Sequence, residues 1–85
     1  MKFQIFGNCL KISNHKGEVL SLGGDDNCRG DGVRDRLSII FEDQSGNDII
    51  PDWLDDSEKT ELVRDKELTV WTNPNRFLSL LQRHL

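Results

Sequence analysis

The sequence predicts an α+β fold: a small antiparallel β-sheet of about five to six short strands, one short surface helix, and a C-terminal helix packed on the sheet. Three observations predict it. Short runs of alternating apolar and polar residues recur along the chain, turn residues separate them, and apolar residues at helical spacing end the chain. With 85 residues and no repeat or linker, we expect a single domain over residues 1–85.

The first half of the chain is expected to begin with three strands. Residues 3–6 form the first strand and residues 9–13 the second. Residues 18–22 return as the third strand after a turn at residues 14–17, in which Gly17 supplies the left-handed backbone position. The second and third strands therefore read as a β-hairpin.

Three further strands are predicted downstream. Residues 37–41 alternate between two faces, and a turn at residues 44–47 leads to a return strand at residues 48–50. Pro51 then ends that strand or confines it to an edge, because proline donates no backbone hydrogen bond. Residues 67–72 alternate again and contain β-branched and aromatic types that favour a strand.

The surface helix is predicted from its N-terminal signal. Asp55 and Glu58 have the spacing of a capping box, in which each side chain bonds the backbone of the other residue. We expect the helix to run to about residue 65, with few apolar residues and with Leu62 and Val63 as its main anchors.

The C-terminal helix is predicted from an N-cap at Asn73 and a proline at the first helical position, Pro74. Arg83 and His84 suit the negative end of the helix. The apolar residues that recur at helical spacing, and that we expect to face the sheet, are Phe77, Leu78, Leu81 and Leu85.

Charge is distributed unevenly along the chain. The formal net charge is −4, and residues 42–61 contain eight acids against one lysine. Such a face repels phosphate, so we expect no direct nucleic-acid ligand, whereas a basic protein partner is compatible with it. The alternative is a solvated surface that keeps the protein soluble. The acids are Glu42, Asp43, Asp48, Asp52, Asp55, Asp56, Glu58 and Glu61.

The expected location is cytoplasmic. The N-terminus does not resemble a signal peptide, and no apolar run approaches the roughly 20 residues of a membrane span. Cys9 and Cys28 are the only cysteines and show no metal-type spacing, so we expect two reduced thiols. The core of so short a chain is small, which makes a homodimer compatible with the sequence.

The candidate partner-binding site surrounds Trp53. An aromatic residue flanked by acids has the composition of an interface anchor with a charged rim. The alternative is that Trp53 is a core residue that holds the surface helix in place. The predicted partner-binding residues are Asp52, Trp53, Leu54, Asp55 and Asp56.

A second candidate site is the stretch 23–35, which holds clustered acids and four glycines. Oxygen ligands on a sharply turning backbone suit calcium, although the spacing does not follow an EF-hand loop. The alternative is a turn in which the arginines at 29, 34 and 36 neutralise the acids. The predicted metal ligands are Asp25, Asp26, Asn27, Asp31 and Asp35.

Four motifs in and before this stretch carry a family resemblance: Phe6-Gly7-Asn8, Gly17-x-Val19, Gly24-Asp25-Asp26-Asn27 and Gly30-Asp31-Gly32. With them, residues 3–43 resemble the calcium-binding part of TerD-type tellurium-resistance stress proteins, in which a similar hairpin feeds a Gly-Asp-Asn and then a Gly-Asp-Gly loop. The resemblance implies a β-sandwich and calcium coordination by Asp25 or Asp26, Asn27, Asp31 and Asp35. Val33 and Arg34 stand where the family has acids, and the chain is about half the length of a family domain.

The sequence favours a binding protein over an enzyme. Arg29 is expected to promote the thiolate of Cys28, but nothing brings His15 or His84 to that thiol. We therefore expect a small acidic non-enzymatic protein that binds a basic partner through residues 42–61, with no cofactor. The alternative function is a calcium-binding module that uses residues 24–35.

The calcium alternative has a direct test. If residues 24–35 bind calcium, millimolar calcium will raise the melting temperature by several degrees, because a ligand that binds only the folded state stabilises it. Asp31→Ala should abolish the rise, and a chelator should reverse it. A melting curve that does not respond to calcium would contradict the calcium module.

Overall fold

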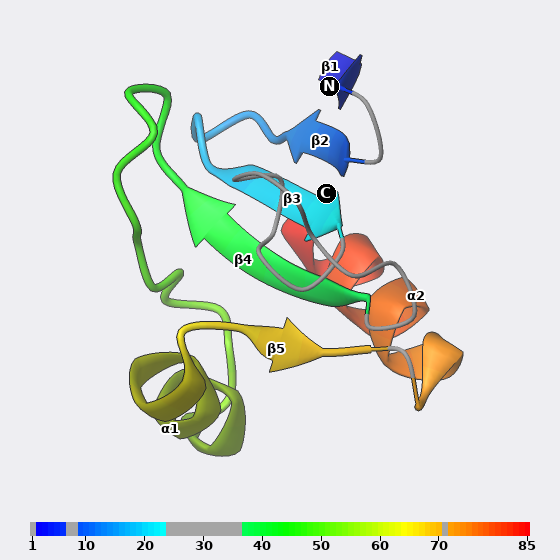
Figure 1. The fold of residues 1–85 in the computed structure, drawn as a ribbon. Helices are drawn as coiled ribbons and strands as arrows, with labels where there is room; N and C mark the ends of the chain where they lie inside the picture. The colour runs from blue at the N-terminus through cyan, green and yellow to red at the C-terminus, as the bar shows by residue number, and fades with distance from the viewer. Residues whose placement is uncertain (1, 7–8, 24–36, 71) are drawn as a thin grey trace.

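The computed structural model of the protein describes residues 2–6, 9–23, 37–70 and 72–85. Within these residues, five antiparallel strands form one sheet in chain order, and two helices accompany it (Figure 1). The predicted α+β class, with an antiparallel sheet and a C-terminal helix, is confirmed. The elements are β1 (Lys2–Phe6), β2 (Cys9–Ser13), β3 (Val19–Gly23), β4 (Ser38–Glu42), α1 (Asp56–Asp65), β5 (Leu68–Thr69) and α2 (Pro74–His84).

The sheet is built from neighbouring strands whose apolar residues face each other. Leu20 of β3 pairs with Ile12 of β2 on one side and with Phe41 of β4 on the other. Because side chains alternate along a strand, this register places all three residues on one face of the sheet. Gly17 in the β2–β3 turn has φ +80°, the left-handed conformation that the sequence predicts.

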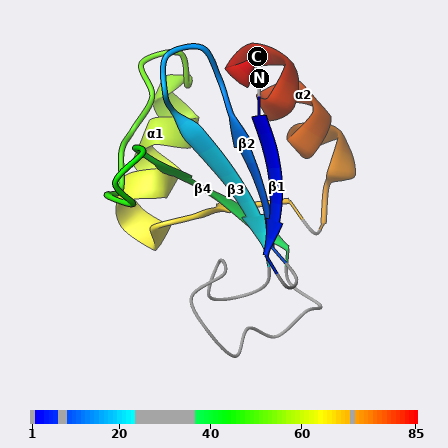
Figure 2. The ribbon, with the colours of Figure 1, turned by 90° about the horizontal axis from the view of Figure 1, so that it is seen from above.

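The core lies against this apolar face. Seen from above, α1 and α2 flank the strands (Figure 2). Each helix contributes one buried leucine to the core cluster. Leu62 of α1 is 6% exposed and Leu80 of α2 is completely buried. The buried cluster consists of Leu20, Ile39, Phe41, Leu54, Leu62, Leu68, Val70 and Leu80.

Two predicted strands are shorter than expected. The return strand at residues 48–50 is reduced to a single bridge between Glu42 and Asp48, because Pro51 follows at once and starts a turn closed by the Leu54 amide. The strand predicted over 67–72 covers only Leu68–Thr69 in the described residues. The chain must leave the sheet there to reach the start of α2.

The capping box of α1 is confirmed. The Asp55 carboxylate accepts a hydrogen bond from the Glu58 amide at 2.7 Å, and the Glu58 carboxylate accepts one from the Asp55 amide at 3.0 Å. Leu62 anchors the helix as expected, but Val63 is 56% exposed, so its prediction as an anchor is wrong. One residue is a turn of about 100° on a helix, which carries Val63 away from the core.

The facing side of α2 also differs from the prediction. Leu78 is 55% and Leu85 48% exposed, whereas Leu80 and His84 are buried. Apolar residues span a wide arc of this helix, so spacing alone does not fix which part faces the sheet. Pro74 occupies the first turn as expected, but the Asn73 side chain makes no capping hydrogen bond.

The neighbours Leu62 and Val63 provide a matched test of this packing. Leu62→Ala should lower the free energy of unfolding by about 2–4 kcal/mol, because it opens a cavity in the core. Val63→Ala should change it by less than about 0.5 kcal/mol, since the side chain is exposed. Equilibrium denaturation of both variants measures the difference, and equal losses would contradict the orientation of α1.

Candidate functional site

The predicted partner-binding residues lie in the loop before α1 and in its first turn. Asp52, Asp55 and Asp56 are exposed there, at one end of the helix. The sequence predicts Leu54 as a partner-binding residue. Leu54 is 4% exposed and belongs to the core cluster, so its side chain does not lie on the surface. Its burial instead fixes the loop that carries the three aspartates.

Trp53 is half-buried and holds the same loop against the sheet. Its ring packs edge-to-face on Phe41, with centroids 5.3 Å apart, and its indole Nε1–H donates to Glu18 Oε1 at 3.2 Å. The guanidinium of Arg83 lies 5.6 Å from the ring centroid. These contacts support the core alternative for Trp53, while part of its surface remains in reach of solvent.

Glu58 is engaged inside the protein. Arg83 of α2 donates two hydrogen bonds to its carboxylate, at 2.9 Å to Oε1 and 2.7 Å to Oε2, and Glu58 is only 7% exposed. The hydrogen bond from Arg83 lowers the pKa of Glu58 more than burial raises it, with the Asp55 amide also lowering it. Glu58 is therefore a charged structural residue.

Glu61 forms a second pair between the helices. Arg76 donates to both carboxylate oxygens, at 3.2 and 2.7 Å, and also to the Thr69 carbonyl at 2.9 Å. The Thr69 amide in turn donates to Glu61 at 3.3 Å. The pKa of Glu61 is lowered, mainly by the hydrogen bond from Arg76. This network joins α1, β5 and α2.

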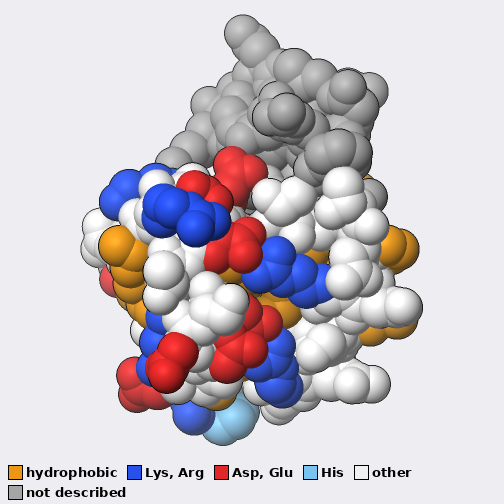
Figure 3. Space-filling view, turned by 90° about the horizontal axis from the view of Figure 1, so that it is seen from below, with side chains coloured by type: hydrophobic (Ala, Val, Ile, Leu, Met, Phe, Trp, Pro, Cys, Tyr) orange, Lys and Arg blue, Asp and Glu red, His pale blue; other side chains and the backbone are white. Residues whose placement is uncertain are grey.

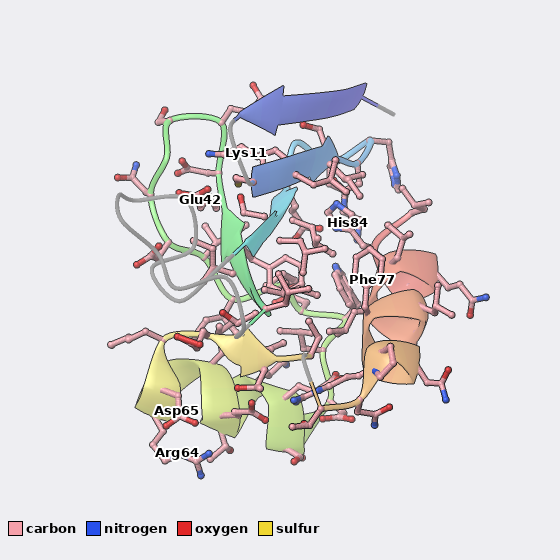
Figure 4. The ribbon with its side chains drawn as sticks, turned by 45° about the vertical axis from the view of Figure 1, so that its right-hand side comes forward. Lys11, Glu42, Arg64, Asp65, Phe77 and His84 are labelled. Atoms are coloured by element: carbon pink, nitrogen blue, oxygen red, sulfur yellow. The ribbon has the colours of Figure 1, made fainter. Side chains whose placement is uncertain are left out.

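Glu42 is the third acid used internally. Its Oε1 atom lies 3.3 Å from Lys11 Nζ and accepts a hydrogen bond from Ser21 Oγ at 3.0 Å. Figure 4 shows Lys11 and Glu42 pointing toward one another across the strands. Asp43, next in the chain, accepts from the Asn47 and Ser45 amides in the following turn, and these bonds lower its pKa.

The remaining acids at the start of α1 have no cationic partner. Within the described part of the chain, Asp52, Asp55 and Asp56 form no ion pair. Acidic and basic side chains lie side by side over the face of the molecule seen from below (Figure 3). We call Asp52, Asp55 and Asp56 the acidic surface.

His84 occupies a buried site that sequence reasoning missed. Its Nε2 atom lies 2.8 Å from the Ile12 carbonyl oxygen, which only accepts, so Nε2 carries the proton. Asn14 Nδ2 donates to the His84 carbonyl at 3.0 Å and lies 3.4 Å from Nδ1. Burial lowers the pKa of His84, although the Ile12 carbonyl and the Glu18 charge oppose this. His84 lies in the last turn of α2 as expected, but it is buried, so its ring serves the interior and not the helix dipole alone.

The calcium ligands predicted within residues 25–35 lie outside the described residues, as does Cys28. In the part of the chain that the structure describes, no group of three or more His, Cys, Asp or Glu side chains is placed to hold a metal ion. Cys9 is buried and disulfide-bonded. The expectation of reduced thiols is therefore wrong. Cysteine usage no longer supports the expected cytoplasmic location.

No family model, curated protein or solved structure matches the chain. The resemblance of residues 3–43 to TerD-type proteins stays a prediction. Among the described residues, no helix is long and apolar enough to cross a membrane.

The Glu58–Arg83 pair predicts a dependence of stability on acid pH. The pKa of Glu58 is lower in the folded state than its ordinary value of 4.5, so the unfolded chain takes up the proton first. The free energy of unfolding should fall as pH drops below 4.5. Glu58→Gln should make this fall less steep and cost about 1–3 kcal/mol at neutral pH.

Denaturation curves at several pH values measure this effect. Gln82→Ala, at an exposed position of α2, should keep the slope of the wild type. A Glu58→Gln variant with the same acid slope as the wild type would show that the pair does not link stability to pH.

Proposed function

We propose that the protein is a small non-enzymatic binding protein that engages a basic protein partner through its acidic surface. One observation carries the proposal: the acids of residues 42–61 include three that are paired with cations and three that stay exposed together. Glu42, Glu58 and Glu61 are neutralised by cations of the same chain. Asp52, Asp55 and Asp56 remain exposed together at one end of α1.

Helix formation accounts for only part of this charge. Asp55 caps α1, and Asp56 lies in its first turn, where a negative charge interacts favourably with the helix dipole. Asp52 precedes the cap, is exposed and has no role in starting the helix. An exposed charge without a structural task supports a role in recognition over a role in stability.

The loop beneath the acidic surface is held before any partner arrives. Leu54 is buried in the core, and Trp53 is fixed by Phe41 and Glu18. A surface that is already ordered loses little conformational entropy on binding, so more of the contact energy appears as affinity. Its charge would also accelerate encounter with a basic partner at low ionic strength.

The chemistry of the buried polar residues supports binding over catalysis. Ser21 is completely buried and donates its hydroxyl proton to Glu42. His84 is 1% exposed and both of its ring nitrogens face internal partners. A nucleophile and a base of this kind have no access to a substrate without rearrangement.

The acidic surface predicts a salt-sensitive interaction that depends on two charges. Asp52→Asn with Asp56→Asn should weaken binding of the partner at least about tenfold at low salt, because it removes charge without changing shape. Capture experiments at about 50 and 300 mM salt, with quantification of the bound proteins, measure this effect. A partner retained equally by this double variant would contradict the proposal.

A matched control removes two charges at the other end of α1. Arg64 and Asp65 lie on the outer side of that helix, away from the sheet (Figure 4). Asp65→Asn with Glu67→Gln alters the net charge by the same amount but leaves the acidic surface intact. It should bind like the wild type, and an equal loss in both double variants would indicate an effect of net charge only.

A further inference from the structure

A chain of contacts links the acidic surface to the buried imidazole of His84. Trp53, in the loop that carries Asp52 and Asp55, has its ring 5.9 Å from the ring of His84. Glu18 Oε1 accepts hydrogen bonds from both Trp53 Nε1, at 3.2 Å, and Asn14 Nδ2, at 2.8 Å. One carboxylate oxygen thus holds both the loop and the residue that faces His84.

The site around His84 fits only the neutral ring. The Ile12 carbonyl accepts a hydrogen bond from Nε2–H, so in the neutral ring Nδ1 carries no proton. Nδ1 faces Asn14 Nδ2 at 3.4 Å. The Asn14 amide cannot turn its oxygen to the ring, because that oxygen accepts from the Lys16 and Glu18 amides at 3.0 Å each. A second ring proton would point at an N–H group.

Three charged groups surround this site. Glu18, from the β2–β3 connection, favours a charged ring, whereas Arg83, on α2 itself, lies over Trp53 and is paired with Glu58 of α1. Burial outweighs the attraction of Glu18, so the pKa of His84 lies below its ordinary value of 6.5. His84 is therefore neutral at neutral pH, and acid is needed to charge it.

We propose that protonation of His84 releases Trp53 and its loop, and thereby makes the acidic surface sensitive to mild acid. The new Nδ1–H needs an acceptor, and the carboxylate beside Asn14 is Glu18. If the ring takes Glu18 Oε1, the indole of Trp53 loses its hydrogen bond to Glu18, and the loop that positions Asp52 and Asp55 moves. The consequence for partner binding rests on the proposed function, but the movement itself does not.

The movement is tested by NMR without any partner. In ¹H–¹⁵N spectra recorded from about pH 8 to about pH 5, the indole signal of Trp53 and the amides of residues 52–56 should shift together. The midpoint of these shifts should lie below pH 6.5 and match the titration of the His84 ring. The amide signals of the strands should keep their positions. Trp53→Phe assigns the indole signal.

Two variants should change the pH transition, and a control variant should not. His84→Gln, which stays neutral, should abolish it, and Glu18→Gln should displace its midpoint to lower pH because a favourable negative charge is lost. His15→Gln, at an exposed position of the turn, should leave it unchanged. If His84→Gln does not fold, the displacement by Glu18→Gln in the presence of His84 decides the question.

Several results would overturn the inference. One is a Trp53 indole signal that stays fixed while His84 titrates, and another is a single midpoint shared by all signals, which would indicate global unfolding. Failure of the proposed function is distinguishable, because it would appear as binding unaffected by Asp52→Asn with Asp56→Asn even when the pH transition is present. Binding that needs those aspartates but is independent of pH would remove only the switch.

Discussion

The two ion pairs between α1 and α2 are the interactions on which the rest of the structure depends. In both pairs, Glu58–Arg83 and Glu61–Arg76, the two terminal nitrogens of the guanidinium donate to the two carboxylate oxygens, at 2.7 to 3.2 Å. α1 contributes a single leucine, Leu62, to the buried cluster, so apolar packing alone holds this helix weakly. Loss of one partner would leave a partly buried charge unpaired, which costs more than the pair contributes. The orientation of α1, and with it the acidic surface, follows from these pairs.

The loop before α1 couples this frame to the sheet. Leu54 enters the core, while Trp53 contacts β4 through Phe41 and the β2–β3 connection through Glu18. The capping box then fixes the first turn of α1 relative to the same loop. Within residues 52–56, Trp53 and Leu54 anchor the loop, and the aspartates on either side of them face solvent. This arrangement explains how an exposed charged segment keeps a defined shape in a protein with a small core.

Sequence reasoning succeeded where the signal is local and failed where it depends on distant residues. The β2–β3 hairpin and the capping box follow from patterns a few residues long. The environment of His84 involves Ile12, 72 residues away, and no local pattern contains that information. The ion pairs did leave a signal: Glu58 and Glu61 share one face of α1, while α2 has two arginines and no acid. Reading the two helices together would have predicted their pairing.

The acidic segment illustrates why a count of charges overstates a binding surface. Of its eight acids, Glu42, Glu58 and Glu61 are balanced by lysine or arginine of the same chain, and Asp43 is used in a turn. A partner responds to the charge that remains, because internally paired charges contribute little field outside the protein. The aspartates at the start of α1 supply that remaining charge on a loop anchored beside His84. The proposed electrostatic recognition and the proposed protonation of His84 therefore meet at one residue of the fold, Trp53.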